Sequence, residues 1–306
     1  MLPLLVGMIA KRKIMQMSNS SFIVTLPKDW ADTNGLIKGE EIEFQGIGND
    51  LIIKGQKEKE LKINLDLSEM SYDLIWRHLI CSYRKGANEL TINYGNKENL
   101  SHIMFFVKDL TGWAIVKQDN KKIVIKDLIS VENTDFDDTF KKVFLLVLDI
   151  SQQTLDGLKK QDKEALENIK YFDYNINKFS NLCLRILNLK GSEYTRTNSL
   201  YKIISTLEEI ADEYRKLAIF YKPSKLSSEL VGIFEKINKL LEKFFEVFYN
   251  FSSKKLIDFA VFSEEVLSEM KQFKRTSLNE TRTFATLFTI LHMIKSLNEE
   301  NLVLSL

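Results

Sequence analysis

Residues Arg12–Phe44, RKIMQMSNSSFIVTLPKDWADTNGLIKGEEIEF, decide the fold of the N-terminal part of this chain. Apolar and other side chains alternate over Ser21–Leu26, which is the two-residue period of a β-strand. Pro27 ends this strand and can open one helical turn, because an early helical position needs no backbone N–H. The alternation over Glu41–Gln45 and the apolar run Leu51–Ile53 predict a hairpin.

These short strands form a module that is too small to be stable alone. A module of roughly 45 residues buries little apolar surface, and a second copy of the chain can complete its core. We therefore expect a homodimer. The stretch resembles the small DNA-binding modules of the AbrB, SpoVT and MazE type, and this resemblance implies a swapped-hairpin dimer that binds DNA.

The positive charge of this module is concentrated at its start. The whole chain has a net charge of only +1, but the residues before Asp29 include four cations and no acid. Cations release counterions from DNA, while hydroxyl and backbone N–H groups contact its phosphates. The nearby acids Glu40, Glu41 and Glu43 count against a uniformly basic surface. The predicted DNA-binding residues are Lys11, Arg12, Lys13, Ser18, Asn19, Ser20, Ser21 and Lys28.

The length and composition predict a soluble protein of two or three domains. The chain has 306 residues, of which 44% are hydrophobic and 28% charged, so it can bury a sizeable core. Cys81 and Cys183 lie far apart, which excludes a disulfide framework and fits a reducing compartment. Met1–Ala10 is apolar but too short to span a membrane, and its flanking charges are the reverse of those in a signal peptide. It is either an extra strand or an over-extended start, and we expect a cytoplasmic protein without membrane insertion.

We predict an α+β multidomain fold with a module at residues 1–56, a small linking α/β domain at 61–135 and an all-α domain at 137–306. In the linking domain, Ser68 is expected to cap one helix, and His102–Leu110 is expected to form another. In the last domain, apolar residues recur every three or four positions and breaks suggest two successive groups of three antiparallel helices. The expected helices are 138–160, 163–189, 197–221, 226–252, 254–275 and 278–299.

Polar oxygen atoms in the all-α domain form a candidate metal site. Asp173 falls on the apolar stripe of its helix, and Asn177 lies one turn on. A buried carboxylate needs a metal, a cation or a proton. Glu208 and Asp212 lie one turn apart on the next helix, so the four side chains converge if the helices face each other. Such oxygen ligands suit hard ions such as magnesium. A plainer interpretation pairs the carboxylates with basic side chains, namely Arg185, Lys178 or Arg215.

The order of these parts resembles the archaeal-type PhoU family of phosphate uptake regulators. Glu208 and Asp212 match its Glu-x-x-x-Asp element, and Asp173 matches the start of a companion Asp-x-x-x-Asp element in which Asn177 replaces the second acid. Trp76–Ile92 and Lys108–Leu128 are similar to its linking α/β segment. The resemblance implies two three-helix repeats, of which the second is degenerate. It also implies bound iron or zinc, and a transporter ATPase or sensor kinase as partner.

The sequence does not support an enzyme. The chain has three histidines, and none follows a glutamate at the spacing of a di-iron site. It has no phosphate-binding Gly-Lys-Ser/Thr loop and no nucleophile elbow. His78 and His292 are interpreted as structural, the latter within the core. The aromatic segment Phe234–Phe251 is interpreted as bundle core, with a docking face for a partner as the alternative.

These observations predict a DNA-binding regulator of phosphate homeostasis. Two other interpretations remain open. In the first, the β module only dimerises, and the helical domain inhibits a phosphate transporter by contact. In the second, the carboxylates store a metal or use one for hydrolysis.

Overall fold

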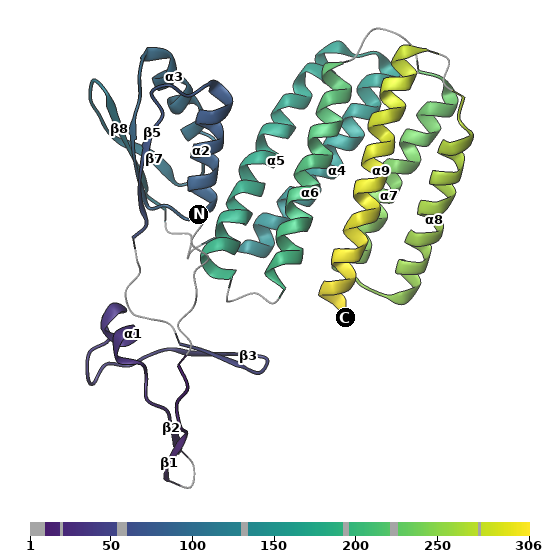
Figure 1. Cartoon of the computed structure of the whole chain (residues 1–306). Coiled ribbons are helices and arrows are strands. Elements are labelled where there is room, and N and C mark those ends of the chain that lie inside the picture. The colour runs from purple at the N-terminus through teal and green to yellow at the C-terminus, as the bar shows by residue number, and fades with distance from the viewer. Residues whose placement is uncertain are drawn as a thin grey trace. The chain divides into compact units, whose positions relative to one another are not determined.

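The computed structural model describes residues 10–18, 21–53, 60–129, 134–191, 196–220, 226–274 and 277–306. The chain forms two compact units, Met1–Glu60 and Leu61–Leu306 (Figure 1). A small β-rich region is followed by a mostly helical one, as the α+β prediction requires. The finer division of the second unit at residues 135–137 stays a prediction, although two separate hydrophobic clusters lie on either side of it.

The first unit consists of two hairpins around one short helix. The strands β1 and β2 are antiparallel, as are β3 and β4. The strand predicted to reach Leu26 ends at Ile23, because its pairing with β1 ends at Met15. The strand predicted from Glu41 begins only at Phe44, where its pairing with β4 starts. The elements are β1 (Met15–Ser18), β2 (Ser21–Ile23), α1 (Lys28–Thr33), β3 (Phe44–Ile47) and β4 (Asp50–Ile53).

The second unit begins with a four-stranded sheet in the order β5-β6-β8-β7. The first two strands of this order are parallel, and β8 is antiparallel to both of its neighbours. Buried side chains of the sheet and of the helices α2 and α3 share one core, which includes Leu79, Tyr83 and Trp113. The elements are β5 (Lys62–Asp66), α2 (Tyr72–Arg84), β6 (Glu89–Asn93), α3 (Lys97–Val107), β7 (Trp113–Gln118) and β8 (Lys122–Asp127).

The predicted starts of α2 and α3 are both wrong. Ser68 does not cap α2, because its hydroxyl donates to Asp66 and the helix begins after Ser71. The helix predicted from His102 begins at Lys97, because the Asn96 side chain accepts a hydrogen bond from the Asn99 N–H and caps it there.

Long helices make up the rest of the second unit (Figure 1). Within each of two sets, α4 to α6 and α7 to α9, every helix contacts the other two, and the sets join through α6 against α9 and α4 against α7. Their bounds lie close to the predicted ones because the apolar period is long and regular. They are α4 (Phe136–Lys160), α5 (Lys163–Lys190), α6 (Thr197–Ile219), α7 (Ser228–Tyr249), α8 (Ser253–Gln272) and α9 (Leu278–Ser305).

A tight turn fixes how α4 meets α5. Gln161 ends α4 in the left-handed conformation, and the Asp162 side chain caps α5 by accepting from the Ala165 N–H. A Cβ atom on Gly157 would lie 2.8 Å from Leu166 Cδ2, so a larger residue at this position would require the Leu166 side chain to shift. The turn therefore places the first turns of α5 firmly against the end of α4.

The aromatic segment of α7 lies mainly in the core, as predicted. Phe234 and Phe244 are fully buried, and the ring of Phe144 from α4 lies 5.8 Å from that of Phe244. Tyr249 and Phe251, at the end of the segment, are exposed. The prediction for His292 is wrong, because its side chain is exposed and contacts the ring of Phe288. Of the helices in the described ranges, none is long and apolar enough to cross a lipid bilayer.

Candidate functional site

The predicted DNA-binding cations are exposed in the first unit. Lys11, Arg12 and Lys13 directly precede β1, and Lys28 is the first residue of α1. Within the part of the chain that the structure describes, no ion pair joins these four side chains to a carboxylate. Their charges are therefore available to an anionic partner such as a phosphate backbone.

The structure describes only some of the predicted DNA-binding residues that have uncharged polar side chains. Ser21 begins β2 and is exposed, and its backbone pairs with that of Ser18 at the end of β1. Asn19 and Ser20 lie outside the described residues, as does the side chain of Ser18. The pairing of β1 with β2 brings Ser21 to the same end of the hairpin as Ser18.

The first unit leaves its large apolar side chains open to solvent. Phe22 is 73% exposed and Leu51 is 62% exposed, and no apolar residue of its described part is buried. Exposed apolar surface of this kind often marks an interaction site, and pairing with a second chain would cover it. This observation is consistent with the predicted homodimer.

Three of the four predicted metal ligands form an acidic cluster between α5 and α6. Asp173 and Asp212 share the guanidinium of Arg215, which lies 3.1 Å from Asp173 Oδ2 and 3.0 Å from Asp212 Oδ1. The first of these pairs is close in distance, but its angle falls outside hydrogen-bond geometry. The plainer sequence interpretation, which named Arg215 as a partner, matches this arrangement for these two carboxylates.

Burial and repulsion between carboxylates raise the pKa values of Asp173 and Glu208. Burial, opposed by the charge of Arg215, raises the pKa of Asp173 to about 6. Burial, helped by the charge of Asp212, raises the pKa of Glu208 to about 7. Glu208 therefore titrates near neutral pH, which is a property of many functional carboxyl groups and of some purely structural ones.

The cluster as folded does not fit a metal ion. Among the described residues, no group of three or more histidine, cysteine, aspartate or glutamate side chains is placed to hold one. The guanidinium of Arg215 already provides the positive charge that Asp173 and Asp212 need. Asn177 is half-buried one turn beyond Asp173, and among the described residues no hydrogen bond joins it to the other three. Metal binding here would require Arg215 to move away.

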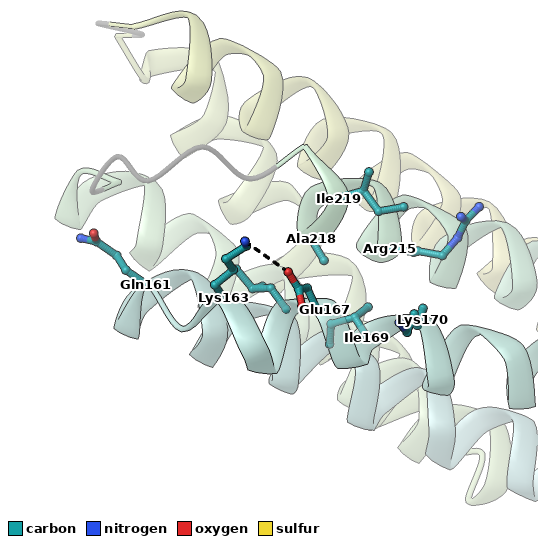
Figure 2. A pocket seen from close by; sticks show the side chains of 9 residues that line it. Gln161, Lys163, Glu167, Ile169, Lys170, Arg215, Ala218 and Ile219 are labelled. Atoms are coloured by element: carbon teal, nitrogen blue, oxygen red, sulfur yellow. Dashed lines mark ion pairs between the residues drawn. The ribbon is translucent and has the colours of Figure 1, made fainter.

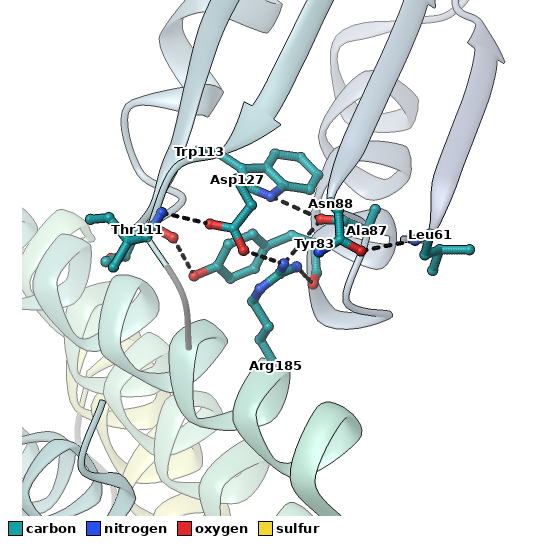
Figure 3. Close-up of polar contacts among 9 residues, drawn as sticks. Leu61, Tyr83, Ala87, Asn88, Thr111, Trp113, Asp127 and Arg185 are labelled. Carbon is teal, nitrogen blue, oxygen red and sulfur yellow. Dashed lines mark hydrogen bonds and ion pairs between the residues drawn. The ribbon is translucent and has the colours of Figure 1, made fainter. Parts of the chain in front are cut away.

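A second polar centre, which the sequence did not reveal, joins the sheet to the helices (Figure 3). Arg185 of α5 is only 1% exposed and donates to the carbonyl oxygens of Tyr83 and Ala87. It also pairs with Asp127 at the end of β8, at 2.7 Å. Its guanidinium lies over the ring of Tyr83, 4.8 Å from the centroid. The one available signal was an arginine within the otherwise apolar run Leu182–Leu187, where a surface residue is not expected.

Comparison with known proteins found a family match in the first unit. Residues 15–60 match the profile of the family described as antidote-toxin recognition MazE, bacterial antitoxin. No curated protein and no solved structure matches the chain significantly. The matched segment ends at Glu60, where the first compact unit also ends. Residues 15–60 thus form a MazE- and AbrB-like module, of a kind that is typically DNA-binding and oligomeric.

Proposed function

We propose that this protein is a cytoplasmic, homodimeric, non-enzymatic DNA-binding regulator. The observation that carries the proposal is the MazE-like module at residues 15–60, with the exposed cations Lys11, Arg12 and Lys13 at its start. A dimer would present two such basic segments, and unpaired cations of this kind supply the salt-dependent part of DNA affinity.

The finer proposal is regulation of phosphate uptake by a PhoU-like helical part. It is supported by the two sets of three helices, α4 to α6 and α7 to α9, and by Glu208 and Asp212 on α6. In this proposal the helical part contacts a phosphate-transporter ATPase or a sensor kinase, and the contact changes how the dimer binds DNA.

Replacing Lys11, Arg12 and Lys13 together by alanine is expected to weaken duplex binding and flatten its salt dependence. Six cations would be lost from a dimer, so the slope of log affinity against log salt should fall by about 5 if each contacts a phosphate. The measurement is fluorescence anisotropy of promoter DNA over a salt series. The matched control replaces Lys141, Lys142 and Lys254, which are exposed lysines of the second unit, by alanine.

A lack of duplex binding by the unmodified protein at low salt would overturn the DNA-binding proposal, whereas unchanged binding by the triple variant would overturn the assignment to these three cations. A specific feature favours the alternative that the first unit only dimerises, namely its uncovered apolar side chains such as Phe22 and Leu51. In that case the triple variant would stay a dimer and keep its contact with the transporter, while neither protein would bind DNA at low salt.

Metal binding by Asp173, Asn177, Glu208 and Asp212 stays a prediction with its own test. Iron, zinc and magnesium are the candidate ions, and each would have to displace Arg215 from Asp173 and Asp212. The prediction requires elemental analysis of the purified protein to find less metal in Asp173→Ala than in the unmodified chain. The absence of metal from the unmodified protein, even after incubation with these ions, would contradict the prediction.

A further inference from the structure

A groove runs between α5 and α6 next to the turn that joins α4 to α5 (Figure 2). Its volume is about 590 Å³, which lies within the roughly 300–1,000 Å³ of small-molecule sites. Leu166 and Ile169 of α5 form one apolar wall, and Ala218 and Ile219 of α6 form the other. The cap of α5 and the close contact of Gly157 with Leu166 hold the first wall in place.

The rim of the groove has more basic than acidic side chains. It has three cations, Lys163, Lys170 and Arg215, and one carboxylate, Glu167. Glu167 is 3.5 Å from Lys163 in an exposed pair, which binds weakly in water. The remaining carboxylates near the groove, Asp173 and Asp212, are already held by Arg215.

Lys170 is the cation with the most freedom to bind a ligand. Its amine lies 5.0 Å from the centroid of the neighbouring Tyr171 ring, and none of the described carboxylates pairs with it. The groove therefore combines an apolar interior with an uncompensated positive charge at its edge. A ligand that matches both features has a hydrocarbon part and a single negative charge.

We propose that this groove binds an amphipathic monoanion, an alkyl carboxylate whose chain lies between α5 and α6. The carboxylate would pair with Lys170 and Lys163, and the chain would cover the exposed Ile219 and lie against the outer edges of the buried Leu166 and Ile169. Burial of methylene groups against the apolar walls supplies affinity, and the lysines supply selectivity for an anion. The inference concerns the second unit alone and goes beyond the proposed binding of DNA.

The direct test is titration calorimetry of the full chain with decanoate, below its micelle concentration. Decanoate is expected to bind with one site per chain. Decylammonium has the same hydrocarbon chain with the opposite charge, and inorganic phosphate has negative charge without a chain. Neither is expected to bind at this site, so the two comparisons separate the contributions of charge and hydrocarbon.

Two exposed substitutions test the location. Lys170→Glu should weaken decanoate binding about tenfold, because it replaces an attractive charge by a repulsive one. Ile219→Gln should weaken it about threefold through lost apolar contact. The matched control is Lys142→Glu, which makes the same charge change on an exposed face of α4. It lies about 15 Å from Lys170 along the antiparallel helices, at 1.5 Å per residue. All of these positions are exposed, and circular dichroism will verify that each variant folds.

Three results would overturn the inference. The first is no saturable binding of decanoate to the unmodified chain. The second is equal binding of decanoate and decylammonium. The third is equal affinity of Lys170→Glu and Lys142→Glu for decanoate, which would place the bound chain elsewhere, for example on the exposed apolar residues of the first unit.

Discussion

Replacing Arg185 by methionine is expected to lower the free energy of unfolding of the second unit by about 3–5 kcal/mol. The substitution leaves the carboxylate of Asp127, which is only 8% exposed, without its cation. It also removes the donors to the carbonyl oxygens of Tyr83 and Ala87 (Figure 3). Breaking a buried ion pair from one side is costly because the remaining charge cannot be solvated.

Urea denaturation gives the measurement, and Trp113 gives a local signal. Its ring centroid lies 6.0 Å from the Arg185 guanidinium, so its fluorescence should report loss of this centre first. The matched control is Lys159→Met, which breaks an exposed pair with Glu235 and should cost less than about 1 kcal/mol.

A double variant separates the ion pair from simple loss of packing. Adding Asp127→Asn to Arg185→Met removes the unpaired charge, so part of the lost stability should return. The Arg185 guanidinium does not connect the sheet to the helices if Arg185→Met lowers the free energy of unfolding no more than Lys159→Met does. The same conclusion follows if the loss in the double variant equals the sum of the losses in the two single variants. In that case α5 and α2 would be held by their apolar contacts and by the hydrogen bonds of Arg84.

The contacts of Arg185 connect α5 to the sheet, so they can couple these two parts of the second unit. Two further hydrogen bonds join α2 to α5. Arg84 of α2 donates to Asn181, and the carbonyl oxygen of Arg84 accepts from Asn188. Asp173 lies on the same helix as Arg185, twelve residues earlier, which is about 18 Å at 1.5 Å per residue. A movement of α5 caused at the acidic cluster would therefore reach the sheet through a rigid element.

The sequence predicted the long helices α4 to α9 better than anything else. The helix expected at 163–189 is α5, Lys163–Lys190, because a regular apolar stripe and the capping Asp162 define it locally. The strands of the first unit were less well predicted, because their ends depend on pairing. The strand expected to reach Leu26 ends at Ile23, where its partner ends.

The surroundings of single side chains were predicted less well, because they depend on helix phase and on partners that lie far away in the sequence. His292 follows the buried Leu291, but one residue turns an α-helix by about 100°, which is enough to place it in solvent. Asp173 was correctly placed as a carboxylate in need of a partner, and the sequence offered Arg215 only as one choice of three. The partner of Arg185 is Asp127, 58 residues away, and no local pattern indicates such a pair.

Replacing Glu208 by glutamine is expected to stabilise the protein above pH 7 by about 2–3 kcal/mol and to change little at pH 4. Burial raises the pKa of Glu208 to about 7, from 4.5 in an unfolded chain. The folded state therefore binds a proton that the unfolded state has lost between these pH values. Stability falls as pH rises from about 4.5 to 7, and glutamine removes this dependence because it has no charge to bury.

Urea denaturation at pH 4, 6 and 8 measures whether Glu208→Gln becomes more stable than the unmodified protein as the pH rises. Glu209→Gln is the matched control, because Glu209 is its exposed neighbour on α6. Parallel pH profiles for Glu208→Gln and the unmodified protein would contradict the expected titration.

The same experiment separates the two interpretations of the acidic cluster. Without a metal, deprotonation of Glu208 is unfavourable, so raising the pH destabilises the fold. A metal ion held by Asp173, Glu208 and Asp212 would favour the deprotonated carboxylates and give the opposite trend. Because Arg215 already pairs with two of these groups, we expect the first trend in metal-free buffer. A reversal on adding iron, zinc or magnesium, lost in Glu208→Gln, would mean that the ion displaces the guanidinium.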